Sequence, residues 1–159
     1  MLKLYKRIDG VPRYHEAWAH EGVLSEHWGV VGEEGELKEH KLSRKDNEEQ
    51  AIRDILRPAS EAGFSPMTTE DHIALVIEYA MKGHGTVADI DKRHSLEARM
   101  NETLGWTALG HCDGGSIGLG SMEVFCFDVD FEIAKRVIEH DLKGTEFGDY
   151  TRICTNEDL

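Results

Sequence analysis

The densest group of chemically special residues is the segment 110–120, Gly-His-Cys-Asp-Gly-Gly-Ser-Ile-Gly-Leu-Gly. A glycine-rich loop can point several backbone N–H groups at a phosphate, but such loops join a strand to the N-terminus of a helix. The patterns on either side, residues 106–112 and 121–129, both predict strands. The sequence therefore argues against a dinucleotide-binding loop. It predicts a long, flexible hairpin connection, and a recognition role for this connection stays open.

Within this segment, His111, Cys112 and Asp113 could bind a metal ion or supply a thiol nucleophile. Adjacent residues of a strand point to opposite faces, however, and the chain has no second CxxC or HxxxH element that would complete a zinc site. It also has no Walker loop, GxSxG elbow or kinase signature. We therefore expect no catalytic residue, no metal site and no cofactor, and we expect Cys126 to be a small core residue.

Acidic side chains gather in the second half of the chain. Asp130 precedes a helical pattern and is explained as its N-cap. The others either form a solvated rim or offer an acidic surface to a basic protein partner. The predicted partner-binding residues are Asp113, Glu123, Asp128, Glu146 and Asp149.

The net charge of −13 supports this interpretation. Residues 1–66 hold ten Lys and Arg against thirteen Asp and Glu, a balance of −3, so residues 67–159 carry the remaining −10. Such a surface repels phosphate backbones and anionic membranes, and it attracts basic proteins. Acidity that serves only solubility is the alternative explanation.

The elements that must position these residues begin with four alternating runs, at residues 2–8, 13–20, 23–31 and 35–42. They predict an antiparallel meander, with the turn Asp9-Gly10 after the first run. A helix follows, with Ser43 as its expected cap and an apolar stripe that includes Ile52 and Leu56. Gly63-Phe64 is typical of a left-handed C-cap with its hydrophobic contact.

The third run ends in Trp28-Gly29-Val30-Val31-Gly32-Glu33-Glu34-Gly35, where glycines supply backbone angles for a tight turn. Trp28, Gly29, Gly32 and Gly35, with the helix and the glycine–aromatic pair that follow, resemble the WGR domain over residues 1–66. This resemblance implies a small antiparallel sheet with one helix. It also implies an alternative function as a nucleic-acid or ADP-ribosylation accessory protein.

The chain departs from the WGR pattern where the family contacts its ligands. Val30 stands in place of the motif arginine, and Glu33 and Glu34 occupy the following turn. Two acids without the arginine disfavour contact with nucleic acid. The resemblance therefore predicts the scaffold, and nucleic acid is not an expected partner.

Residues 65–69, Ser-Pro-Met-Thr-Thr, form the expected linker to a second domain at 67–159. There the order strand, helix, strand, strand, helix, strand predicts a ferredoxin-like arrangement. A helix capped by Thr86 ends at Gly105, the strands are 72–80, 106–112, 121–129 and 149–155, and Asp130 caps the second helix. Helices cover only one face of such a sheet, so we expect the other to be covered. The N-terminal domain is the favoured cover, and a second copy or a partner are the alternatives.

The expected compartment is the cytoplasm. Residues 1–7 lack the apolar segment of a signal peptide, and no apolar run approaches the length of a membrane span. Cys112, Cys126 and Cys154 are too few for a disulfide framework. The sequence thus predicts an α+β protein of two domains that binds a basic protein without catalysis, as a bacterial immunity or antitoxin-type inhibitor does. Its oligomeric state stays open.

Overall fold

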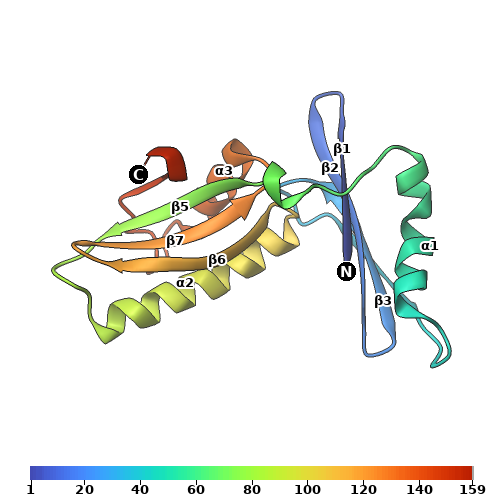
Figure 1. The fold of residues 1–159 in the computed structure, drawn as a ribbon, viewed down its shortest axis with the longest axis horizontal. Coiled ribbons are helices and arrows are strands. Elements are labelled where there is room, and N and C mark those ends of the chain that lie inside the picture. Colours follow the sequence, from blue (N-terminus) through green and yellow to red (C-terminus); the bar gives the residue numbers. More distant parts are fainter. Residues whose placement is uncertain (159) are drawn as a thin grey trace. The chain divides into compact units, whose positions relative to one another are not determined.

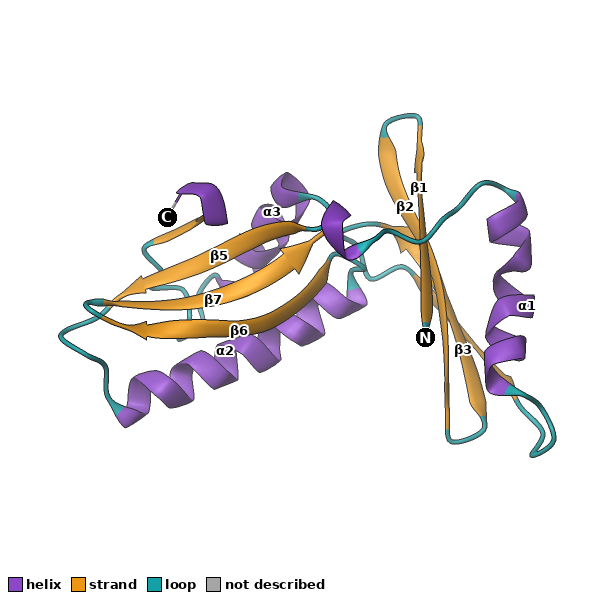
Figure 2. Cartoon of the chain, in the orientation of Figure 1, coloured by secondary structure: helices purple, strands orange, loops and turns teal. Residues whose placement is uncertain are grey.

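The computed structural model describes residues 1–158 and divides the chain into two compact units, with the boundary between Thr69 and Glu70. Each unit contains one four-stranded antiparallel sheet, with one α-helix in the first unit and two in the second (Figures 1 and 2). The α+β class expected from the sequence is confirmed. The predicted linker is wrong at its first residue, because Ser65 still bonds to the backbone of Tyr5 beside the first strand.

The sheet of the first unit is a meander in the order β1-β2-β3-β4, as predicted. Asp9-Gly10 and Glu21-Gly22 join its first three strands by two-residue turns, and all four residues have positive φ angles of 50–79°. Positive φ at both central positions is the mark of a type I′ turn, whose twist matches that of the flanking strands. The strands are β1 Leu2–Ile8, β2 Val11–His20, β3 Val23–Val30 and β4 Glu36–Lys41.

The helix of the first unit, α1, spans Glu48–Glu61. Its N-cap is Asn47, whose side chain accepts the Gln50 N–H at 2.9 Å, so the prediction of Ser43 was wrong. Ser43 instead closes a separate turn with Asp46. The predicted C-cap is confirmed, since Gly63 has φ +91° and the next residue donates its N–H back into the last turn. One core joins helix to sheet, made of Leu4, Ala17, Leu24, Ile52, Leu56 and Ala59.

The sheet of the second unit has the order β6-β7-β5-β8, with β5 and β7 central as predicted. Both helices pack on one face of it (Figure 2). The opposite face is called the helix-free face below. The elements are β5 Ile73–Ala80, α2 Val87–Trp106, β6 Gly110–Gly118, β7 Ser121–Asp128, α3 Phe131–Leu142 and β8 Arg152–Thr155, with short 3₁₀ turns at Thr69–Asp71 and Asn156–Asp158.

The capping predictions for α2 and α3 hold at the N-termini, where Thr86 forms a capping box and Asp130 accepts the Ile133 N–H. The predicted end of α2 was wrong. The helix continues past Gly105, and Ala108 (φ +53°) takes the left-handed position while Leu109 donates to the Leu104 carbonyl at 2.9 Å. The predicted strand at 106–112 therefore begins only at residue 110, and β8 begins at residue 152 rather than 149.

The glycine-rich segment is the edge strand β6 and not the flexible connection that we expected. Glycine is required there because the neighbouring strand lies too close for a side chain. A Cβ on Gly110 would sit 1.9 Å from the Phe127 carbonyl oxygen, and one on Gly115 would sit 2.2 Å from that of Glu123. A bulge lies between Cys112 and Gly115. The glycines thus allow close pairing of the strands.

Candidate functional site

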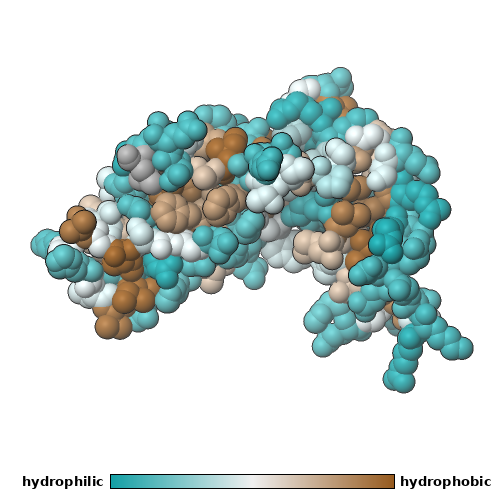
Figure 3. Space-filling view, in the orientation of Figure 1, coloured by the Kyte–Doolittle hydropathy of each residue, from teal (hydrophilic) through white to brown (hydrophobic). Residues whose placement is uncertain are grey.

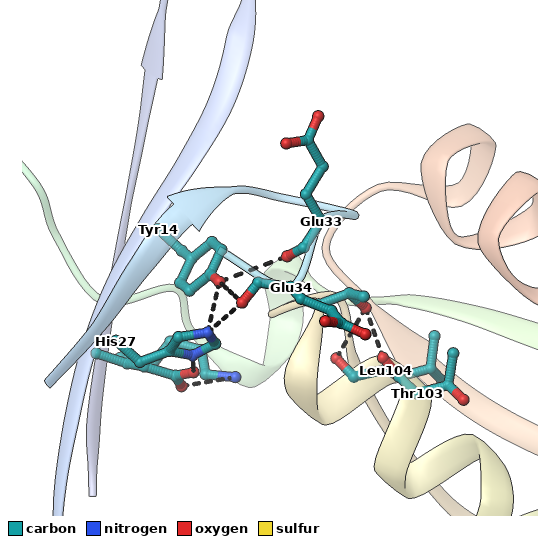
Figure 4. Close-up of polar contacts among 9 residues, drawn as sticks. Tyr14, His27, Glu33, Glu34, Thr103 and Leu104 are labelled. Carbon is teal, nitrogen blue, oxygen red and sulfur yellow. Dashed lines mark hydrogen bonds and ion pairs between the residues drawn. The ribbon is translucent and has the colours of Figure 1, made fainter. Parts of the chain in front are cut away.

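Residues 28–35, the motif segment of the first unit, close over a buried series of hydrogen-bonded polar side chains (Figure 4). Tyr14 and His27 lie on neighbouring strands, and the Tyr14 hydroxyl is 2.9 Å from His27 Nε2. His27 Nδ1 lies 2.8 Å from Glu16 Oε1, and the other Glu16 oxygen pairs with Lys3 Nζ at 2.9 Å. Tyr14, Glu16 and His27 are 3% exposed or less.

This chain of contacts ends on the backbone of the motif. The Tyr14 hydroxyl donates to the Glu34 carbonyl at 3.0 Å, and His27 Nε2 contacts the same oxygen. Gly35 lies so close to Tyr14 that a Cβ would sit 2.2 Å from the hydroxyl oxygen. A Cβ on Gly29 would in turn sit 2.8 Å from the Gly35 Cα. Gly29 and Gly35 therefore let the turn pack onto the sheet.

The other two motif residues complete this turn. Gly32 has φ +94°, in the region that favours glycine. The Trp28 ring lies on the face of the sheet away from Tyr14, with its centroid 5.7 Å from that of His15. The four motif residues thus have a clear structural role.

A carboxylate, an imidazole and a hydroxyl in series can activate a nucleophile. Here burial, together with Glu16, Glu33 and Glu34, raises the pKa of Tyr14 above its ordinary value. The hydroxyl also donates a hydrogen bond to a carbonyl oxygen, which can only accept one, so the hydroxyl must keep its proton to make this contact. Both features keep Tyr14 protonated, so the network orders the turn instead of supplying a nucleophile.

The five residues predicted to form one acidic surface lie in three different places in the second unit. Glu123 and Asp113 lie on the helix-free face, Asp113 in the bulge opposite Phe125. Glu123 belongs to a polar row that crosses all four strands: Ser116, Glu123, Glu78 and Arg152 are register partners in turn. The Ser116 hydroxyl donates to Glu123 at 2.6 Å, and Arg152 pairs with Glu78 at 2.8 Å.

Beside this polar row, the helix-free face is apolar. Phe125 and Phe127 are half-buried on β7, whereas Val76 on β5, the register partner of Phe125, is fully buried. The His111 ring packs on Phe127 with their centroids 5.8 Å apart. Figure 3 shows a group of paler and brown side chains within hydrophilic surroundings over the part of the second unit that contains β5 and β7. Aromatic side chains are enriched at protein interfaces.

Asp128 is not part of that surface, which corrects the prediction. It follows Val124 and Cys126 on the inward side of β7, and it is 0% exposed. Neither carboxylate oxygen has a hydrogen-bond partner among residues 1–158. Burial without a partner disfavours the charged form and raises the pKa of Asp128 to about 8. Alternation along β7 was the signal that placed it inside.

Glu146 and Asp149 also lie apart from the helix-free face. They belong to the connection between α3 and β8, both exposed. Asp149 pairs with Lys92 of α2 at 2.6 Å, on the side of the sheet that the helices cover. Nearby, the buried Tyr79 hydroxyl donates to the Phe147 carbonyl of this connection at 2.7 Å. Of the five predicted residues, the structure brings Asp113 and Glu123 to one face.

Cys112 and Cys126 are joined by a disulfide, with their Cα atoms 3.9 Å apart in register on β6 and β7. Cys126 is a buried core residue as expected, but its disulfide was not predicted, and Cys112 has no thiol for catalysis. The two cysteines flank the β6–β7 turn at nearly equal distances, a signal that the odd cysteine count concealed. Cys154 is free and buried. Since disulfides persist in oxidising compartments, the cysteine count no longer supports a reducing one.

Among residues 1–158, no three or more His, Cys, Asp or Glu side chains are grouped so that they could hold a metal ion. No helix in this range is long and apolar enough to cross a membrane. Comparison of the chain with family models, with curated proteins and with solved structures finds no match.

Proposed function

We propose that the chain is a non-enzymatic protein-binding module that uses the helix-free face of its second sheet to bind a basic protein. The observation that carries the proposal is the composition of this face, where half-buried Phe125 and Phe127 lie beside the acidic residues Asp113 and Glu123. Apolar aromatic area supplies binding energy, and the acids select and steer a basic partner. The charge of −10 on residues 67–159 acts in the same direction.

An immunity or antitoxin-type inhibitor is the function that we propose within this class. Such an inhibitor acts by covering the active site of a toxin, so it needs a stable, complementary surface and no catalytic group of its own. A toxin that cleaves or binds nucleic acid has a basic active site, and an acidic face complements it. The WGR-type accessory function remains the alternative, and Val30, Glu33 and Glu34 argue against it.

The test is affinity purification of the tagged chain from its native host at moderate salt, with the captured protein then produced pure. We expect one stoichiometric basic protein whose expression arrests growth and whose effect the chain relieves. Charge reversal of the face, Asp113→Lys with Glu123→Lys, should weaken binding at least tenfold by isothermal titration calorimetry.

The matched control is Glu146→Lys with Asp149→Lys, which changes the net charge equally in the α3–β8 connection. It should weaken binding less than threefold, because long-range charge alone acts there. Equal losses in both variants would contradict the helix-free face as the contact. Recovery of nucleic acid in place of a protein would support the WGR-type alternative.

A further inference from the structure

Three hairpins of this chain close with the same turn, and one of them carries an unexpected residue. Asp9-Gly10, Glu21-Gly22 and Leu119-Gly120 are all two-residue connections with positive φ at both positions. The first residue is acidic in two of the turns. In the third it is Leu119, with φ +52° and 92% of its side chain exposed.

Leucine is energetically unfavourable at this position for two independent reasons. Its Cβ makes the left-handed backbone unfavourable, whereas Asn and Asp tolerate it. Its apolar side chain also gains nothing from folding when it stays in water. Because the same chain places acids at the two equivalent turns, Leu119 is best explained by a contact made outside the folded chain.

Leu119 has apolar neighbours at the same end of the second unit. The turn is tied to the β5–α2 connection, since Met81 donates its N–H to the Gly120 carbonyl at 2.7 Å and Gly120 donates to Gly83 at 3.0 Å. That connection leads into α2, whose first residues include Val87 (74% exposed) and Ile90 (43%). Figure 3 shows brown side chains over this end, near the β6–β7 turn and the start of α2. Leu119, Val87 and Ile90 are called the tip patch below.

The β6–β7 turn that carries Leu119 adjoins the helix-free face, whereas Val87 and Ile90 lie on α2, on the other side of the sheet. Ser121 follows the turn directly, and its hydroxyl donates to Glu123 at 3.0 Å. The charged residues of the connection and of the first turns of α2 are Lys82, Asp89, Asp91, Lys92 and Arg93. Lys92 and Arg93 are paired with Asp149 and Glu97, which leaves Lys82 against Asp89 and Asp91. With −10 on residues 67–159, this end repels a second copy of the chain and an anionic membrane alike. Charge therefore favours a basic protein as the occupant.

We infer that the tip patch is the apolar anchor of the partner-binding surface, with Leu119 seated in an apolar pocket of a basic protein. This inference rests on the proposed function for the nature of the partner. It adds the residue that contributes most of the apolar contact. In many interfaces a few side chains seated in water-excluding pockets supply most of the binding energy.

The test uses a defined probe, a synthetic amphipathic helical peptide made only of Leu and Lys, titrated into the ¹⁵N-labelled full chain. We expect the amide signals of Leu119, Gly120, Val87 and Ile90 to shift. Leu119→Asn should weaken binding at least tenfold while its Tm equals or exceeds that of the wild type, because Asn-Gly is the favoured type I′ sequence. Glu21→Asn makes the same change at an equivalent turn and should leave binding within twofold.

Several outcomes would overturn the inference. A lower Tm for Leu119→Asn would make Leu119 a structural residue. Equal binding by this variant would remove the anchor while leaving the charge-based proposal intact, which the Asp113→Lys, Glu123→Lys variant tests in the same titration. Equal shifts with a Leu-Glu peptide, or with phosphatidylcholine vesicles, would exclude a basic protein as the occupant. No shift with the Leu-Lys peptide would exclude the anchor as well.

Discussion

Asp128 is a carboxylic acid in a fully buried site that disfavours its charged form. In the unfolded chain its carboxyl has a pKa near 3.8, whereas burial raises the folded-state pKa to about 8. Between these values the unfolded state releases a proton that the folded state keeps. The contribution of Asp128 to the free energy of unfolding is therefore fully present below pH 4. It falls by about 1.4 kcal/mol per pH unit as the pH rises toward 8. Asp128 thus makes the folded state less stable as the pH rises through neutrality.

Asp128→Asn should remove this dependence, because the amide does not titrate. In urea unfolding, the free energy of unfolding of the variant relative to that of the wild type should rise by about 1.4 kcal/mol for each pH unit between pH 5 and 8. Comparing the two proteins at each pH cancels the titration of all other groups. A difference that stays constant with pH would mean that Asp128 has a partner in solution or is ionised throughout.

Among the elements, the turn at residues 32–35 depends most on the absence of a side chain. Gly35 has φ +69°, and an added Cβ would meet both the Tyr14 hydroxyl and the Trp28 carbonyl oxygen, at 2.2 and 2.4 Å. Gly35→Ala should lower the free energy of unfolding by about 3 kcal/mol or more, since backbone strain and overpacking add. Thermal and urea unfolding measure this directly.

Gly22→Ala is the matched control for this substitution. Gly22 has a similar φ of +79°, but nothing lies within 4 Å of the position that a Cβ would take. Only the backbone strain remains, so a loss of about 1 kcal/mol is expected. Equal losses at both positions would show that the turn does not pack against Tyr14 as the structure has it.

Elements with local signals could be predicted from the sequence, and those decided by distant contacts could not. The caps at Thr86, Asp130 and Gly63 depend on residues within one turn, and all three are confirmed. The end of α2 depends on tertiary packing, since Ala108 takes a left-handed angle while wholly buried. The glycines of β6 suggested a loop, because the close approach of Phe127 that requires them is not visible in the sequence.

The candidate sites follow the same division. Trp28, Gly29, Gly32 and Gly35 were found from their spacing, although their role against Tyr14 was not. That role could have been deduced, because the Glu21-Gly22 turn sets a strand register that places Gly29 beside Tyr14 and Glu16 beside His27. For the acidic residues, composition predicted a surface. The alternation along β7, which puts Asp128 on the same side as buried Val124 and Cys126, was the signal that separates it from exposed Asp113.

At the scale of the whole molecule, the chain has two units with cores of their own. The acidity is concentrated in the second, with −10 in residues 67–159 against −3 in residues 1–66. Both binding proposals and the disulfide fall within the second unit. The network of Tyr14, Glu16 and His27 orders the first. Stability and binding can therefore be perturbed in one unit while the other serves as an internal reference.

Reduction of the disulfide tests this independence. Cys112 and Cys126 are 14 residues apart, and closing a loop of this length stabilises a fold by about 3 kcal/mol. Dithiothreitol should therefore lower the unfolding free energy of the second unit by about that amount and leave the first unchanged. Thiol titration in denaturant should find one free cysteine before reduction and three after it.

The three tryptophans separate the two transitions, because Trp18 and Trp28 lie in the first unit and Trp106 in the second. In a Trp106→Phe variant, fluorescence follows the first unit alone, and circular dichroism follows both. The double variant Cys112→Ala, Cys126→Ala should not respond to dithiothreitol. If reduction shifted the fluorescence transition of Trp106→Phe as well, the two units would unfold together, because loss of the disulfide in one would destabilise the other.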